Sequence, residues 1–242
     1  MNKRRRYRAV LVLGTVCLLM VGAGGLWLRS VRRQEALNRQ LIAALVKDDP
    51  KQALALVNAG ADPNTPLEPM SPPSLTQLWN HLIHRTEPAR NASPSAFFMA
   101  CGAYTSSADF RFLGIHTDEP ELVETMLQHG ARKNAKQYNG MTPLLWSISV
   151  RRPKTAGALI EHGVDVNAQV GGGFTALSWA VFESRTDNPS ERSKDTNIVR
   201  QLLAHGANPN VPGPNGLTPL QMAHNSNRPD LVALLKQAGA KK

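Results

Sequence analysis

The stretch that decides the fold covers residues 139–168 and reads NGMTPLLWSISVRRPKTAGALIEHGVDVNA. Thr142 can cap a helix that begins at Pro143, because proline's fixed φ and missing N–H suit the first helical position. Pro153 predicts the start of a second helix for the same reason. Gly163 predicts the end of that helix, because glycine adopts a left-handed conformation without steric cost. Two short helices and a turn cannot bury an apolar face alone, so the unit requires copies of itself.

Copies of the unit recur along the chain. Glycines that can end a second helix stand at Gly60, Gly130, Gly163, Gly206 and Gly239. Helix openings with Ser or Thr stand at Ser95, Thr142, Thr175 and Thr218. Closures of the form G-(A/V)-(D/N)-x-N follow at 60–64, 163–167 and 206–210. A period of about 33 residues with a T-P-L opening is typical of ankyrin repeats, and residues 35–240 resemble that family.

The resemblance implies an all-α solenoid of about five helix-turn-helix repeats in residues 35–242. The first repeat lacks a Thr-Pro opening, as expected of a terminal capping unit. The histidine of the family's T-P-L-H opening is replaced in every repeat, so its hydrogen bonds must be lost or made by other groups. The replacing residues are Phe98, Leu145, Ser178 and Gln221. Lys236 stands where earlier repeats place an apolar residue, which predicts a solvated outer face on the last repeat.

The N-terminal region predicts a membrane anchor. Residues 9–28 are uncharged and long enough to cross about 30 Å of hydrocarbon as one helix. Trp27 suits the membrane interface. Residues 1–8 then form a basic cytoplasmic tail and residues 29–34 a juxtamembrane linker. The alternative is a cleaved signal peptide with a small-residue cleavage site at 22–24.

Charge is concentrated at this end of the chain. Eight of the 28 Lys and Arg residues precede Glu35, the first acidic residue, which leaves 20 basic residues against 18 acidic ones. A near-neutral body is not the footprint of a nucleic-acid-binding protein. More basic residues precede the apolar run than follow it, which favours a cytoplasmic N-terminus and extracytoplasmic repeats. In a Gram-negative bacterium the repeats would be periplasmic, and signal-peptide cleavage would also export them.

Three segments interrupt the repeat pattern, and one of them adds about 14 residues between Ser95 and Gly130. Residues 65–94 form an insertion with a proline-rich start and an amphipathic helical pattern from Leu75 to Ile83. This helix is expected to pack on the neighbouring repeats, and the alternative is a helix that binds a partner or a membrane surface. Residues 185–195 are polar and charged, which predicts a solvated loop.

The sequence predicts no enzymatic chemistry, cofactor, metal or small-molecule substrate. Cys101 lies at a position that is usually small and packed, so we expect a buried structural thiol. Histidines recur before three of the helix-ending glycines, where this family often carries histidine. These are His129, His162 and His205. His81 and His84 have helical spacing but lack further metal ligands.

The remaining candidate function is protein binding. In ankyrin repeats the residue before the Thr-Pro opening and the end of the first helix typically face a partner. The predicted partner-binding residues are Tyr138, Met141, Val150, Phe174, Phe182 and Leu217. The alternative is local packing, and Trp146 and Trp179 are expected in the core. We therefore expect a non-enzymatic interaction module for an unidentified protein. The alternative is an immunity-type inhibitor that neutralises a delivered effector or regulates an envelope enzyme.

Overall fold

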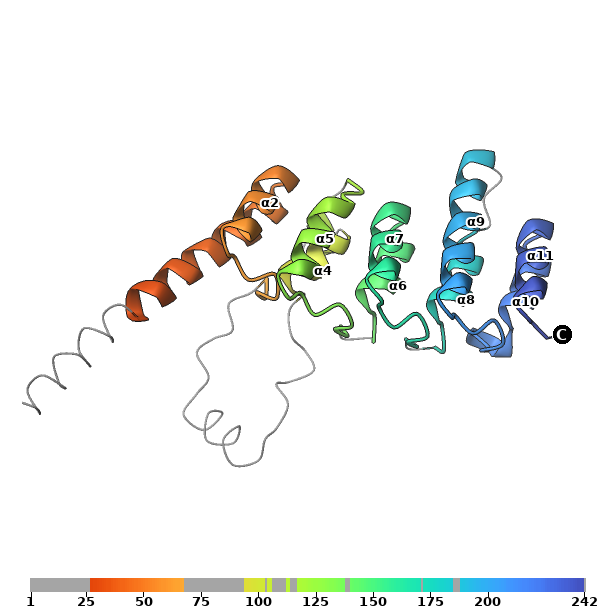
Figure 1. Cartoon of the computed structure of the whole chain (residues 1–242). Coiled ribbons are helices and arrows are strands. Elements are labelled where there is room, and N and C mark those ends of the chain that lie inside the picture. Colours follow the sequence, from red (N-terminus) through yellow and green to blue (C-terminus); the bar gives the residue numbers. More distant parts are fainter. Residues whose placement is uncertain are drawn as a thin grey trace, which may run out of the picture.

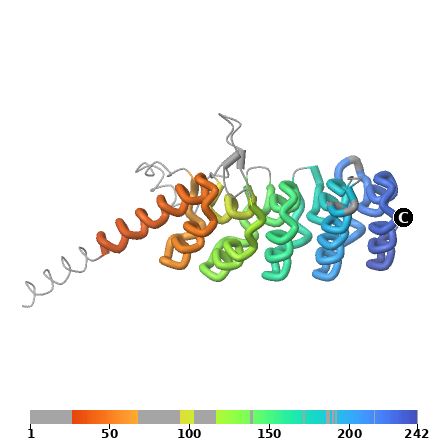
Figure 2. The backbone as a smooth tube through the Cα atoms, turned by 90° about the horizontal axis from the view of Figure 1, so that it is seen from above, coloured from red at the N-terminus to blue at the C-terminus, as the bar shows by residue number. Residues whose placement is uncertain are grey.

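The computed structural model describes residues 27–67, 94–102, 104–105, 112–113, 117–137, 140–170, 172–184 and 188–241. In these ranges the chain forms pairs of helices that stand side by side in one row (Figures 1 and 2). The pairs in order are a helix over residues 27–46 with α2 (Pro50–Asn58), α4 (Ala96–Cys101) with α5 (Pro120–Gln128), α6 (Pro143–Ser149) with α7 (Pro153–Glu161), α8 (Ala176–Glu183) with α9 (Pro189–Ala204), and α10 (Pro219–Asn225) with α11 (Pro229–Gln237).

Short elements outside the helices are few in the described ranges. Strand β1 (Tyr104–Thr105) pairs antiparallel with β2 (Phe112–Leu113), and η1 (Pro214–Gly216) is a 3-10 turn. The first helices pack against one another along the row, and so do the second helices. The architecture fits the predicted all-α repeat solenoid.

The predicted helix caps are present. The Thr142 side chain accepts a hydrogen bond from the backbone N–H of Leu145 at 3.2 Å. In the next two repeats the cap is reciprocal, because the residue in the place of the family's histidine also bonds back. The Ser178 hydroxyl accepts from Thr175 N at 2.9 Å, and Gln221 Oε1 accepts from Thr218 N at 2.9 Å. Ser178 and Gln221 thus stabilise the openings of their own helices.

The closing asparagines explain the G-(A/V)-(D/N)-x-N pattern. Asn167 Nδ2 donates to the carbonyl of Gly206 at 3.0 Å, and Asn167 Oδ1 accepts from the N–H of Asn208 at 2.9 Å. Asn64 and Asn210 make the same pair of bonds to the repeats that follow them. Each closing asparagine therefore holds the carbonyl end of the next repeat's second helix.

The helix over residues 27–46 begins the solenoid. Leu41 and Leu45 are fully buried against the core. Gln34 Nε2 donates to the carbonyl of Gly60 at 2.7 Å, and Asn38 Oδ1 accepts from Asp62 N at 2.9 Å. These two side chains divide between them the bonds that one closing asparagine makes elsewhere.

This helix also bears on the predicted N-terminal anchor. Residues 29–34, expected as a linker, are helical and continuous with the first repeat. Most of the predicted membrane span, residues 9–26, lies outside the described residues, and only Trp27 and Leu28 fall within the helix. Among the described residues, no helix is long and apolar enough to cross a membrane.

The core runs without interruption from the first repeat to the last. Cys101 is completely buried in it, and burial raises the pKa of its thiol far above the ordinary value. The thiol is therefore held protonated and inert, as expected of a structural cysteine. Lys236 is exposed on the last helix, in agreement with a solvated outer face.

The prediction of a solvated loop at 185–195 was wrong for its second half. Residues 189–195 form the first two turns of α9, which extends well beyond the neighbouring helices (Figure 1). Asn188 caps this helix by accepting from Ser190 N at 3.0 Å, and Pro189 occupies its first position. Asn188 followed by Pro189 is a typical start of a helix. The polar composition of residues 185–195 nevertheless led to the prediction of a loop.

The described ends of the 65–94 insertion lie together. The N–H of Leu67 donates to the carbonyl of Pro94 at 2.9 Å, and Pro66 pairs with Ser95 as an antiparallel bridge. The chain therefore leaves and rejoins the repeat at one place. The amphipathic helix predicted over 75–83, with His81 and His84, lies outside the described residues.

Candidate protein-binding surface

Three aromatic side chains of the fourth repeat form the aromatic patch, which we define as Phe174, Trp179 and Phe182. All three are half-buried and pack against the core. The ring of Phe174 lies edge-on to Trp179 with 4.6 Å between the ring centroids, and 5.5 Å from the ring of Phe182. Such edge-to-face pairs hold aromatic rings in fixed positions. The patch therefore offers rigid apolar surface instead of mobile side chains.

The other predicted contact residues occupy different environments. Met141 is only 7% exposed and belongs to the core cluster, which leaves it little area for a partner. Val150 ends α6 and is half-buried, and Leu217 is half-buried before the cap of α10. Tyr138 lies outside the described residues. Of the predicted set, the structure brings Phe174 and Phe182 into direct ring contact, and the partner-binding role stays a prediction.

Trp146 owes its position to a glycine of the preceding repeat. A Cβ atom on Gly102 would lie 2.4 Å from Trp146 Nε1 and 2.8 Å from Val150 Cγ2. The indole ring therefore lies directly on the backbone of Gly102, and the buried ring of Phe98 packs beside it at 5.7 Å. Both tryptophans were expected in the core, and they lie at its edge. Sequence reasoning missed the Gly102 contact because it joins two repeats.

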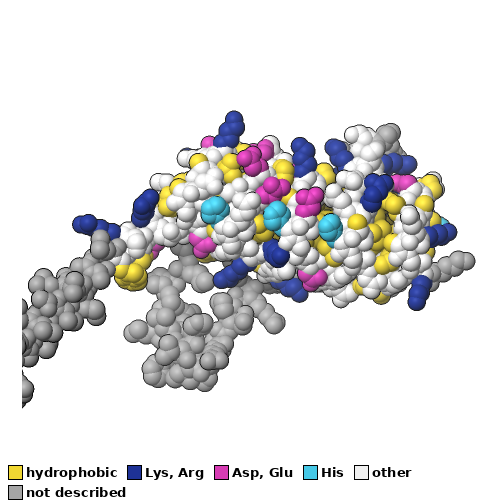
Figure 3. Space-filling model, viewed as in Figure 1, with side chains coloured by type: hydrophobic (Ala, Val, Ile, Leu, Met, Phe, Trp, Pro, Cys, Tyr) yellow, Lys and Arg dark blue, Asp and Glu magenta, His cyan; other side chains and the backbone are white. Residues whose placement is uncertain are grey.

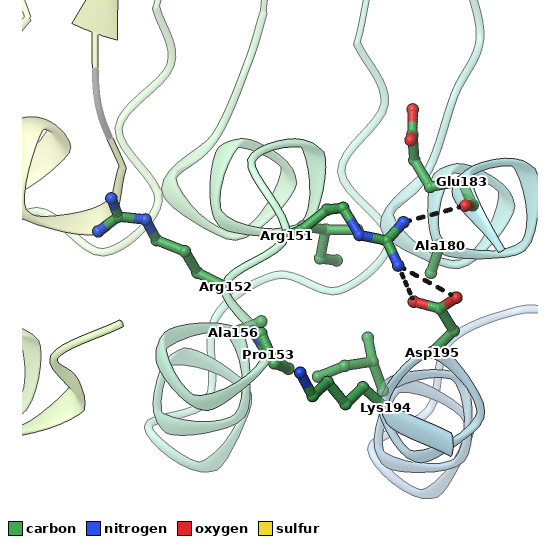
Figure 4. Close-up of a pocket in the computed structure, with 10 residues that line it drawn as sticks. Arg151, Arg152, Pro153, Ala156, Ala180, Glu183, Lys194 and Asp195 are labelled. Atoms are coloured by element: carbon green, nitrogen blue, oxygen red, sulfur yellow. Dashed lines mark hydrogen bonds and ion pairs between the residues drawn. The ribbon is translucent and has the colours of Figure 1, made fainter. Parts of the chain in front are cut away.

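A polar cluster lies at the turns that join the helices of the third, fourth and fifth repeats. Arg151 points toward α9, where its Nη2 meets Asp195 Oδ1 at 3.2 Å and its Nη1 donates to the carbonyl of Glu183 at 3.2 Å (Figure 4). Asp195 Oδ2 also lies 3.9 Å from Arg228 Nη1. One carboxylate therefore links arginines from the repeats on both sides of its own.

Arg228 is the most buried charge of this cluster, at 1% exposure. Its Nη1 donates to the carbonyl of Ser184 at 2.6 Å, and its Nη2 donates to Arg192 O and Thr196 Oγ1. Its guanidinium also makes a bidentate pair with Asp230 at 2.8 and 3.0 Å. That hydrogen bond holds the pKa of Asp230 far below its usual range. The cluster fastens the extended start of α9 to the last repeat.

Arg152 stands at the equivalent place in the third repeat and points away from Arg151 (Figure 4). Its Nη1 donates to the carbonyl of Thr117 at 2.7 Å. Burial lowers the pKa of its guanidinium, and the nearby Asp118 opposes that change. Asp118 in turn accepts from the backbone N–H groups of Lys154 and Thr155 at 2.8 Å. A carboxylate of the second repeat thus caps α7 of the third.

The cavity beside Arg151 and Arg152 is small. It has a volume of about 30 Å³ and lies between Arg151, Pro153 and Ile198. This volume holds one or two water molecules. Within the described ranges, no three His, Cys, Asp or Glu side chains converge as metal ligands.

His129, His162 and His205 follow the second helices of the second, third and fourth repeats. Figure 3 shows histidine side chains in a line on one face of the row. The Nδ1 atoms of His129 and His162 each lie 2.9 Å from the carbonyl four residues earlier in the same helix. Each imidazole ring therefore contacts a backbone carbonyl at the end of its own helix. The histidines are repeated structural features of the solenoid.

Comparison with known families assigns two segments. The ankyrin repeat family model matches residues 139–170 and 172–214, which contain α6 to α9 and the whole aromatic patch. A comparison with curated protein sequences found no match. Ankyrin repeats are general protein-interaction modules. Residues 139–170 and 172–214 are therefore similar to ankyrin repeats, and the helix pairs on either side of these segments stack in the same row.

Proposed function

We propose that this chain is a non-enzymatic protein-binding module, displayed at the extracytoplasmic face of a membrane by its N-terminal apolar helix. The observation that carries the binding role is the aromatic patch. Buried aromatic anchors surrounded by fixed structure provide most of the binding energy at protein interfaces. The predicted partner is a protein, and the predicted anchor is the uncharged run at 9–28.

Rigidity favours this role. The rings of Phe174, Trp179 and Phe182 already contact one another in the free chain. Each side chain that a partner must immobilise costs about 0.5–1.5 kcal/mol on binding. Rings that are already held in place avoid much of that cost. Less of the free energy gained by contact with the partner is therefore lost in ordering these side chains.

The test begins with capture of the partner by the full chain in detergent. Its affinity is then compared with that of a Phe174→Ala/Phe182→Ala variant. We expect a loss of 30-fold or more, because hot-spot aromatics contribute about 2 kcal/mol or more when truncated. The matched control is Leu127→Ala/Leu203→Ala, two half-buried apolar residues on second helices, for which we expect an unchanged affinity.

The outcomes separate the candidate functions. An unchanged affinity of the phenylalanine variant, with its helical circular dichroism preserved, would refute the assigned surface. A captured resident protein of the cell envelope agrees with a scaffold or regulator. A single tight partner that is a toxic effector supports the immunity-type alternative. Membrane display is tested separately with a reporter enzyme fused after residue 40. We expect this reporter to be active outside the cytoplasm, and activity in the cytoplasm alone would contradict the proposed display.

A further inference from the structure

Three arginines near the start of the described chain precede its first acidic residue. Arg29, Arg32 and Arg33 form what we term the arginine stripe, and all three are exposed. No acidic residue precedes Glu35, and Glu35 lies 3.5 Å from Arg39. Within the described ranges no ion pair joins the stripe to another residue. Three uncompensated charges therefore lie within about one and a half helical turns.

The stripe lies on the side of the helix that the repeats leave free. Gln34, Leu41 and Leu45 mark the side that contacts the solenoid, through one hydrogen bond and two fully buried side chains. At 3.6 residues per turn, Arg32 points roughly 160° from that side, Arg29 about 140° and Arg33 about 100°. Arg29 and Arg32 therefore point away from the repeats, and Arg33 points to the side of the helix.

The distance from the apolar run places the stripe at a specific depth. Residues 9–28 carry no charge, and Arg29 follows directly. Because the helix is continuous from residue 27, a rise of 1.5 Å per residue puts Arg29 to Arg33 within about 8 Å of the last apolar residue. The headgroup layer on each side of a bilayer is roughly 5–8 Å thick. If the run spans the membrane, all three guanidinium groups lie among headgroup phosphates.

We propose that the arginine stripe binds anionic phospholipid headgroups at the face of the membrane from which the solenoid projects. The inference rests on the membrane anchor of the proposed function. Guanidinium groups bind phosphate through two parallel N–H donors, a geometry that phosphodiester headgroups match. The first contact of the solenoid, at Gln34, follows the stripe directly. Headgroup binding thus holds the first repeat against the membrane surface.

The experiment measures lipid retention by native mass spectrometry of the full chain in detergent, with phosphatidylglycerol or phosphatidylcholine added. The basic N-terminal tail would also bind anionic lipid, so its charges are first replaced with glutamine. These are Lys3, Arg4, Arg5, Arg6 and Arg8. In this background we expect phosphatidylglycerol to bind on the order of 100-fold more tightly than phosphatidylcholine, because each basic residue near an anionic surface contributes about a factor of five.

The decisive variant is Arg29→Gln/Arg32→Gln/Arg33→Gln, for which we expect the two lipids to bind equally. A control with the same net charge removes three exposed lysines on the repeats and should keep the preference. These lysines are Lys47, Lys51 and Lys236.

Three results would overturn the proposal. The first is equal retention of both lipids before the stripe is changed. The second is an equal loss of preference in the lysine control. The third is tighter binding of a short duplex DNA than of phosphatidylglycerol. Alkaline carbonate extraction of cell membranes distinguishes failure of the lipid-binding proposal from failure of the membrane anchor. A chain that stays in the membrane but has no lipid preference refutes the stripe alone, and a chain that is extracted refutes the anchor and the stripe together.

Discussion

Replacement of Arg228 by alanine tests how the last repeat is held. The guanidinium is 1% exposed and donates to two backbone carbonyls, to Thr196 and to Asp230. Alanine leaves the carbonyl of Ser184 buried without its 2.6 Å partner and removes the pairing of Asp230. Breaking a buried ion pair costs about 3–5 kcal/mol. We expect about 3 kcal/mol, the lower end, because the Asp230 side chain is 43% exposed and water can solvate it.

The assay is amide hydrogen exchange on the full chain, which resolves stability by segment. Repeats contact only their neighbours, so the loss of protection should be confined to α10, α11 and the first turns of α9. Protection in α6 and α7 should not change. Arg200→Ala, an exposed arginine on the same helix α9, serves as the control and should change the free energy by less than about 0.5 kcal/mol. A loss below 1 kcal/mol for the Arg228 variant, or an equal loss for the control, would refute the reasoning.

Three further predictions follow from the contacts between repeats. The pKa of Asp230 is lowered in the folded chain, so the unfolded chain binds more protons in acid and stability falls as the pH drops below about 4. The test is thermal unfolding of Asp230→Asn between pH 5 and 2.5. The variant should melt at a lower temperature than the wild type at pH 5, and its melting temperature should fall less as the pH is lowered. Gly102→Ala should cost about 1–3 kcal/mol and shift the near-ultraviolet signal of Trp146, because the added methyl overlaps the indole ring. A variant with an unchanged spectrum and unchanged stability would contradict that contact. Asn167→Ala should cost about 0.5–1.5 kcal/mol in urea unfolding, because it removes the hydrogen bond to the exposed carbonyl of Gly206, whereas a loss near zero would show that water replaces the side chain.

The regular parts of the fold were readable from the sequence because the repeat period, helix caps and closing glycines are local signals. Thr142 and Pro143 predicted the start of α6 at the residue where it begins. Contacts between repeats were not readable, because the pattern does not say which side chain crosses to the next unit. One example is the pair Gln34 and Asn38, which together make the two hydrogen bonds that a single closing asparagine makes in other repeats.

The candidate surface was predicted only in part. Phe174 and Phe182 were identified from their positions in the repeat, and they lie in ring contact. Met141 has the same position relative to its Thr-Pro opening but is buried at 7% exposure. Position within a repeat therefore does not determine exposure. The left-handed conformation of Arg151, at φ 58°, was likewise unpredicted, since glycine is the usual residue for such a turn.

The asparagine bonds have a consequence for how such a chain can change. Asn64 reaches Gly130 across 66 positions of sequence, whereas Asn210 reaches Gly239 across 29, and the bonds measure 3.0 and 3.2 Å. The spacing of adjacent units is thus independent of the length of polypeptide between them. New segments can be added between these anchor points while the neighbouring units keep their alignment, which makes this architecture a tolerant host for grafted loops.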